Sequence, residues 1–202
     1  EHAMFTPQIP LVKIDNQNLT SFKSWIHQWS LVNNLPIEID ENDIVEASKN
    51  HQFNITDSSE INIDNTFLVV LKPHKKIKFS SGDLLSIKPK GESTKRYYSI
   101  AKIGNKILLS VKRHEFGVCS NYLHELHKNE NISGSIQENK NFHFPKKTKE
   151  VILIANGTGI APFLGMIHEN KNVKIHLFWG GKTKKSLEIY NKYIVTALEN
   201  KT

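Results

Sequence analysis

The chain of 202 residues contains a single cysteine, Cys119, so no disulfide bond can form within it. This is typical of a reducing compartment, and we expect a cytoplasmic location, with the cytoplasmic face of a membrane-anchored parent protein as the alternative. No apolar run approaches the ~18–20 residues of a membrane-spanning helix, and the first residues lack the basic and apolar regions of a signal peptide. Because the chain starts at Glu1 rather than at a methionine, we expect a fragment or an excised domain.

The chain also has fewer acidic than basic residues, which gives it a net charge of +7. The lysines are densest over residues 72–78 and 182–185. Nucleic-acid binding would need a basic stripe with stacking aromatic residues or a recognised motif, and neither is visible. We favour a solvated lysine-rich surface, although a basic face could also steer an acidic partner or an anionic cofactor. His124 and His127 have no carboxylate or cysteine at ligand spacing, so we expect no metal site.

The N-terminal segment, residues 1–52, is expected to be a helical linker. Residues 19–32 have helical spacing, and Thr20 or Ser21 could cap the helix. Its apolar face consists of Phe22, Trp25, Ile26 and Trp29. A second, short helix is expected over residues 40–50. We interpret the first helix as a packing helix, with the tail of an upstream domain as the alternative.

The pattern changes to short strands over residues 53–146, which we predict to be one domain. The expected strands cover residues 61–71, 84–87, 97–101, 106–113 and 132–137, with one helix over residues 120–127. Turns with glycine, such as Ser81-Gly82-Asp83, separate the strands. Several short strands with turns at close spacing indicate an antiparallel β-barrel.

The last predicted domain, residues 147–202, has an α/β pattern. Val151–Ile154 is rich in β-branched residues, which suits a buried parallel strand. A helix follows from Ile160, and a second buried strand is expected over residues 173–179, then a helix over residues 186–198. Two strands separated by a helix indicate a parallel sheet. The predicted fold is therefore an antiparallel β-barrel followed by a truncated parallel α/β domain.

A glycine turn joins the first of these strands to its helix. Gly157, Thr158 and Gly159 precede the helix, and Pro162 falls in the first turn, where a missing N–H costs little. Glycines let backbone N–H groups approach an anion, and a helix N-terminus carries partial positive charge. This turn is therefore a candidate phosphate site, although a plain strand–helix turn would have the same pattern.

Three motifs follow one another in the chain: Arg96-Tyr97-Tyr98-Ser99, Gly117-Val118-Cys119-Ser120 and Gly157-Thr158-Gly159-Ile160-Ala161-Pro162. In this order they resemble the ferredoxin-NADP reductase superfamily, and within it the NADPH sulfite reductase flavoprotein and cytochrome P450 reductase group. The segment Asn141-Phe142-His143-Phe144-Pro145 also resembles that group. The resemblance covers about residues 60–190 and implies an FAD-binding barrel followed by a nicotinamide-nucleotide-binding domain.

The first motif implies contacts with FAD. Arg96 would hold the pyrophosphate through its forked donors, Tyr98 would stack on the flavin ring, and Tyr97 is also expected to bind the cofactor. Ser99, the expected catalytic residue, would place its hydroxyl near the flavin N5 atom, which accepts hydride. The alternatives are a surface ion pair for Arg96 and a core aromatic for Tyr98.

The second motif implies a pyrophosphate site at a helix N-terminus. Its expected cofactor-binding residues are Gly117, Val118, Cys119 and Ser120, and the strand before it would run along the adenosine half with Ser110, Val111 and Lys112. A helix N-terminus can lower a thiol pKa, so a catalytic role is the alternative for Cys119, but we favour a structural one.

The third motif implies that Gly157, Thr158 and Gly159 bind the pyrophosphate of NADPH. The implied reaction is hydride transfer from nicotinamide C4 to flavin N5, followed by electron transfer to a downstream acceptor protein. An upstream FMN-bearing, flavodoxin-type domain is a second expected partner, and the helix over residues 19–32 could be its last helix.

The chain departs from the superfamily in several places. Phe178-Trp179-Gly180 is followed by Gly181, where many members have a cysteine. The Ser-Arg and Lys-x-Tyr segment that reads the 2′-phosphate and the aromatic residue that covers the flavin are not found, so NADPH rather than NADH rests on the resemblance. The alternatives are a non-catalytic flavin-binding or assembly module and a small-molecule-binding barrel without flavin.

Overall fold

The structure is a computed structural model that describes residues 19–34, 49–89, 91–92 and 94–199. The chain divides into two compact units, residues 1–47 and 48–202, which are described separately. In the first unit, α1 (Leu19–Asn33) confirms the predicted helix. The helix begins at Leu19, before Thr20 and Ser21, so the prediction that one of these two residues is its N-cap is wrong. The helix predicted over residues 40–50 lies outside the described residues, apart from its end, where β1 begins.

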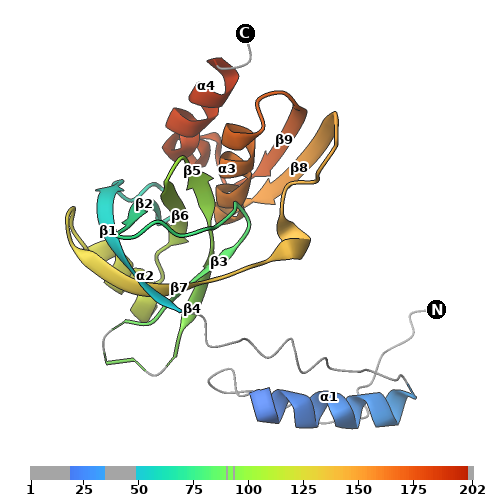
Figure 1. The fold of residues 1–202 in the computed structure, drawn as a ribbon. Helices are drawn as coiled ribbons and strands as arrows, with labels where there is room; N and C mark the ends of the chain where they lie inside the picture. The colour runs from blue at the N-terminus through green and yellow to red at the C-terminus, as the bar shows by residue number, and fades with distance from the viewer. Residues whose placement is uncertain (1–18, 35–48, 90, 93, 200–202) are drawn as a thin grey trace. The chain divides into compact units, whose positions relative to one another are not determined.

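The second unit contains a sheet of seven antiparallel strands in the order β4–β3–β7–β1–β2–β6–β5 (Figure 1). The strands are β1 (Asn50–Ser58), β2 (Thr66–Pro73), β3 (Leu84–Ile87), β4 (Arg96–Ser99), β5 (Ala101–Ile103), β6 (Lys106–Lys112) and β7 (Asn131–Gln137). β4 and β5 lie at opposite edges although only Ile100 separates them in sequence, so the sheet must curl until its edges approach each other. The predicted barrel is confirmed, but the strand predicted over residues 97–101 is two strands, because the pairing partner changes at Ile100.

The alternating pattern of β2 explains how the barrel is buried. Phe67, Val69 and Leu71 belong to the core inside the barrel, whereas Leu68 and Val70 belong to a second apolar cluster outside it. Successive side chains of a strand point to opposite faces. Both faces of β2 are therefore covered, one by the barrel itself and the other by the C-terminal part of the unit.

The C-terminal part has the predicted α/β character. Its elements are β8 (Glu150–Asn156), the 3₁₀ helix η4 (Gly157–Ile160), α3 (Ala161–Glu169), β9 (Lys174–Gly180), the 3₁₀ helix η5 (Lys184–Tyr190) and α4 (Asn191–Glu199); α2 (Val118–Glu125) and η3 (Lys140–Phe142) precede them. β8 and β9 pair in parallel, as predicted (Figure 1). The single helix predicted over residues 186–198 is wrong in its first part, where η5 anchors the buried Tyr190 in the second cluster.

The short parallel sheet is covered on one face. On β8, Leu153 and Ala155 belong to the second cluster, but Ile152 and Ile154 are 62% and 73% exposed. Phe178 on β9 is 57% exposed. The prediction that these strands are buried is therefore correct for one face and wrong for the other, because the helices of the described chain pack on a single side.

A glycine allows α3 to pack directly on β5. A Cβ atom added at Gly165 would lie 2.6 Å from the backbone nitrogen of Lys102 and 3.0 Å from Ala101 Cα, and would collide with Ser81 Oγ. Lys102 Nζ lies 2.7 Å from Glu169 Oε1. Ser81 Oγ accepts a hydrogen bond from the Lys102 backbone N–H at 3.0 Å and donates one to Glu169 Oε2 at 3.2 Å. These contacts join the barrel and the α/β part into one compact unit.

A buried carboxylate fastens the chain between β7 and β8 to the barrel. Asp83 is 3% exposed and accepts hydrogen bonds from the backbone N–H groups of Ser80 at 2.8 Å and Asn139 at 3.0 Å. Its Oδ1 atom lies 2.6 Å from His143 Nε2. Gly82 has a φ of +100°, a conformation that glycine adopts without strain. The Gly-Asp turn and the segment around His143 therefore stabilise each other.

We predict that Gly165→Ala destabilises the chain, although alanine in a helix is favoured over glycine by about 1 kcal/mol. The backbone of β5 blocks the added methyl group, so we expect the free energy of unfolding to fall by about 1–3 kcal/mol in urea titrations. Gly180→Ala is the control, because the nearest atom to its added Cβ would be 3.6 Å away. An unchanged or higher stability of Gly165→Ala would contradict the close packing.

Candidate functional site

The first predicted motif lies on β4, at an edge of the barrel sheet. Among the described strands, β4 pairs with β3 alone, so its other edge has backbone groups that no described strand pairs. Arg96 is exposed, and its Nη1 atom donates a hydrogen bond to the Lys95 carbonyl oxygen at 3.2 Å. Among the residues that the structure describes, no carboxylate forms a salt bridge with Arg96. The ion-pair alternative therefore finds no support, and the guanidinium is available to an anion.

Tyr98 lies half-buried against the barrel core, between the exposed residues Tyr97 and Ser99. Burial raises the pKa of Tyr98, and a hydrogen bond with the Cys119 side chain raises it further. Burial also raises the pKa of the Cys119 thiol and outweighs the opposing effects of Tyr98 and Arg96. Because Cys119 is 5% exposed and its pKa is raised, the geometry favours a protonated, structural thiol over a catalytic one.

The second motif forms the start of α2. Gly117 is the N-cap residue and no side chain caps the helix, so the backbone N–H groups of Val118, Cys119 and Ser120 have no acceptor within the helix. The Ser120 hydroxyl donates a hydrogen bond to the Gly117 carbonyl oxygen at 3.0 Å and accepts one from the His114 N–H at 3.2 Å. A Cβ atom at Gly117 would collide with Ser120 Oγ. Ser120 therefore shapes the turn, and the backbone donors are left for an anion.

The three residues of β6 that were expected to follow the adenosine half differ from one another in exposure and in side-chain contacts. Ser110 Oγ lies 2.7 Å from the Tyr190 hydroxyl oxygen, and Val111 is 2% exposed in the barrel core. Lys112 is exposed. β6 pairs with β5 only as far as Leu108, so the backbone beyond it is unpaired on that edge. A ligand could meet this strand through its main chain and Lys112, but the side chains of Ser110 and Val111 are already engaged.

An aromatic residue that the sequence analysis missed stands beside the second motif. Phe116 is 89% exposed and directly precedes Gly117. An exposed ring next to an anion site is suited to stack on a planar base. The sequence did contain a signal for Phe116, because it is an aromatic residue in a polar loop between a strand and a helix, where neither element could bury it.

The third motif begins where β8 ends. Gly157 has a φ of +53°, and its carbonyl oxygen accepts a hydrogen bond from the Trp179 indole N–H at 3.0 Å. Added Cβ atoms at Gly157 or Gly159 would meet no atom within 4 Å, and Thr158 between them is half-buried. α3 follows with Pro162 in its first turn, as predicted. The open space above these glycines is compatible with a close approach by a phosphate.

The three motifs lie in one compact unit. The Tyr98–Cys119 contact joins the first motif to the second, and η4 lies against β6, the strand that leads to the second.

Among the described residues, no group of three or more His, Cys, Asp or Glu side chains could hold a metal ion. No helix of that part of the chain is long and apolar enough to cross a membrane.

Known proteins with similar sequences include two reductases, while no family model matches the chain. The NADPH sulfite reductase flavoprotein alpha-component of Photobacterium profundum is 26% identical over 193 residues, which cover 86% of this chain and 32% of that protein. NADH-cytochrome b5 reductase 2 of Debaryomyces hansenii is 30% identical over 123 residues, or 57% of this chain and 41% of that protein. The chain thus matches less than half the length of each relative.

Solved structures with the same architecture include a ferredoxin-NADP+ reductase from Plasmodium falciparum, with a TM-score of 0.61 and 19% identity. The match covers 76% of this chain and 72% of that one. At this identity the likeness shows the fold alone. Taken with the sequence matches, it confirms the resemblance to the ferredoxin-NADP reductase superfamily that the three motifs predicted.

Proposed function

We propose that this chain is the FAD-binding reductase module of a larger electron-transfer flavoprotein. In this proposal it takes electrons from NADPH and passes them to an acceptor protein. The observation that carries the proposal is that an open barrel edge, where Arg96 forms no salt bridge with a carboxylate of the described residues, occurs together with the uncapped N-terminus of α2. Relatives named as NADPH sulfite reductase flavoprotein and NADH-cytochrome b5 reductase support it.

The residues present fit the parts of FAD. The guanidinium of Arg96 and the free N–H groups of the first turn of α2 would hold the pyrophosphate. The accessible part of Tyr98 would contact the flavin ring, and the exposed ring of Phe116 would stack on the adenine. Cys119 belongs to the core cluster against which Tyr98 packs, so its proposed role is to help orient the stacking residue.

The open glycine turn fits the pyrophosphate of a nicotinamide dinucleotide. Gly157 and Gly159 leave room for it, and α3 would direct its N-terminus toward the charge. The redox chemistry, hydride acceptance from the nicotinamide and onward electron transfer, would be supplied by the bound FAD. The protein would contribute placement, and the hydroxyl of Ser99, exposed at the end of β4, would bind the edge of the flavin next to Tyr98. The acceptor protein, an upstream FMN-bearing domain and a cytoplasmic location belong to the same proposal.

The proposal predicts a flavin absorption band that survives desalting after FAD has been added to the purified chain. Anaerobic addition of NADPH should bleach this band, because both cofactor sites would be present in one compact unit. NADH at the same concentration is the comparison that distinguishes the two nucleotides. A band that persists with either nucleotide would favour the non-catalytic flavin-binding module, and failure to retain FAD would contradict the flavin site itself.

We predict that Arg96→Ala weakens FAD binding by about 10- to 100-fold, the range expected when a charged hydrogen-bond donor to an anion is lost. Lys95→Ala is the matched control, since Lys95 is an exposed neighbouring cation outside the motif. Quenching of FAD fluorescence would give both dissociation constants. If the two variants weakened binding equally, the effect would be one of general charge, and Arg96 would not be the pyrophosphate ligand.

A further inference from the structure

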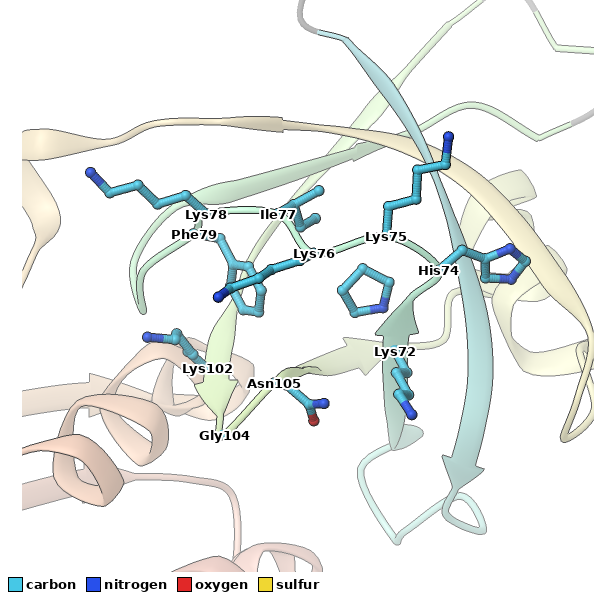
Figure 2. Close-up of a pocket in the computed structure, with 11 residues that line it drawn as sticks. Lys72, His74, Lys75, Lys76, Ile77, Lys78, Phe79, Lys102, Gly104 and Asn105 are labelled. Carbon is cyan, nitrogen blue, oxygen red and sulfur yellow. The ribbon is translucent and has the colours of Figure 1, made fainter.

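A basic groove lies along the loop after β2, away from the proposed cofactor sites. It consists of two hollows of about 860 and 360 Å³, which share His74, Lys75, Lys76 and Ile77 in their linings. We call the two hollows together the lysine groove. Figure 2 shows Lys75, Lys76 and Lys78 extending from this loop in different directions.

The charge of the lysine groove is not neutralised within the described chain. Lys102 is paired with Glu169. The other lysines of the larger hollow, at positions 72, 75, 76 and 78, form no salt bridge with any carboxylate of the described residues. No aspartate or glutamate lines either hollow. The groove therefore presents a concentrated positive charge that would attract an anionic partner.

The groove has an apolar floor and a fixed frame. Phe79 is 6% exposed, and Ile77 is half-buried against the barrel core. The loop is held at its start, where the His74 backbone N–H donates to the Gln52 carbonyl oxygen at 3.0 Å and His74 Nε2 lies 2.9 Å from Asn131 Oδ1. The lysines thus surround an apolar surface on an anchored loop, an arrangement that suits a ligand with both acidic and apolar groups.

The lysine groove is separate from the proposed cofactor sites. It contains none of the residues of the three motifs. Lys102 contacts Glu169, the last residue of α3, whereas Gly157–Gly159 precede the first. α3 has nine residues, so its first and last residues lie about 12 Å apart along the helix axis. On the barrel, the groove lies at the end of the paired strands β2 and β6 where Leu71 pairs with Ile107. Lys112 lies at the opposite end of the same pair of strands.

We propose that the lysine groove docks an extended acidic segment of a partner protein, with an apolar side chain of that segment placed over Ile77 and Phe79. The two hollows share four lining residues along one loop, so an extended segment could follow both of them. A phosphate site is typically built with arginine forks or clustered backbone N–H groups, and the linings contain no arginine. Lysines are flexible point charges, which match the irregular spacing of carboxylates along a peptide.

The test is a fluorescence anisotropy titration with a short labelled peptide in which glutamates flank a central phenylalanine. We expect saturable binding to the whole chain that weakens with added salt. Lys75→Glu combined with Lys76→Glu should weaken it by about tenfold or more, because two attractive charges become repulsive. Lys184→Glu combined with Lys185→Glu is the matched control, since it makes the same charge change on exposed residues of η5 outside the groove.

Each other outcome would overturn the proposal. Equal weakening by both double variants would show attraction by net charge alone, and absence of binding to the wild-type chain would exclude the dock. Displacement by inorganic triphosphate at the concentration of the peptide would indicate a compact polyanion site.

A peptide with glycine in place of phenylalanine should bind more weakly, and equal affinity would contradict the apolar floor. Lys72→Glu combined with Lys78→Glu provides a second groove variant, and thermal unfolding verifies that every variant is folded.

Discussion

The close packing of α3 on β5 is the constraint on which the arrangement of this chain depends. Gly165 has no side chain, so the helix backbone approaches β5, and Ser81, Lys102 and Glu169 hydrogen-bond around the contact. The apolar cluster beneath it combines residues of the barrel with residues of the α/β part, among them Leu68. Neither part could bury these surfaces alone, which explains why residues 48–202 form one compact unit.

This packing determines where the two proposed sites lie. The N-terminal end of α3 carries the open glycine turn, and the adjoining η4 contacts β6, which leads to the uncapped helix α2. The C-terminal end carries Glu169, which holds Lys102 at the margin of the lysine groove. The nicotinamide dinucleotide and the acidic segment would therefore bind near opposite ends of α3. A partner could be held in the groove without displacing the nicotinamide dinucleotide.

Local patterns in the sequence predicted most of the fold, and the resemblance to a known superfamily marked the first two motifs of the site. Alternation marked β2, although the predicted strand began at residue 61 and β2 begins at Thr66. A glycine turn before a helix marked Gly157, because this signal depends only on neighbouring residues. Features set by distant partners could not be predicted in this way. The hydrogen bond between Ser110 and Tyr190 joins β6 to η5, which lies 80 residues further along the chain. The exposure of Ile152 depends on which face of β8 the helices cover.

The central claim is that the edge of β4 and the start of α2 form one FAD site. The most direct test is a crystal structure of the chain with FAD bound. The account predicts that the pyrophosphate receives hydrogen bonds from Arg96 and from backbone N–H groups of residues 118–120, with the flavin ring against Tyr98. FAD density elsewhere on the barrel, with Arg96 and the start of α2 free, would contradict it.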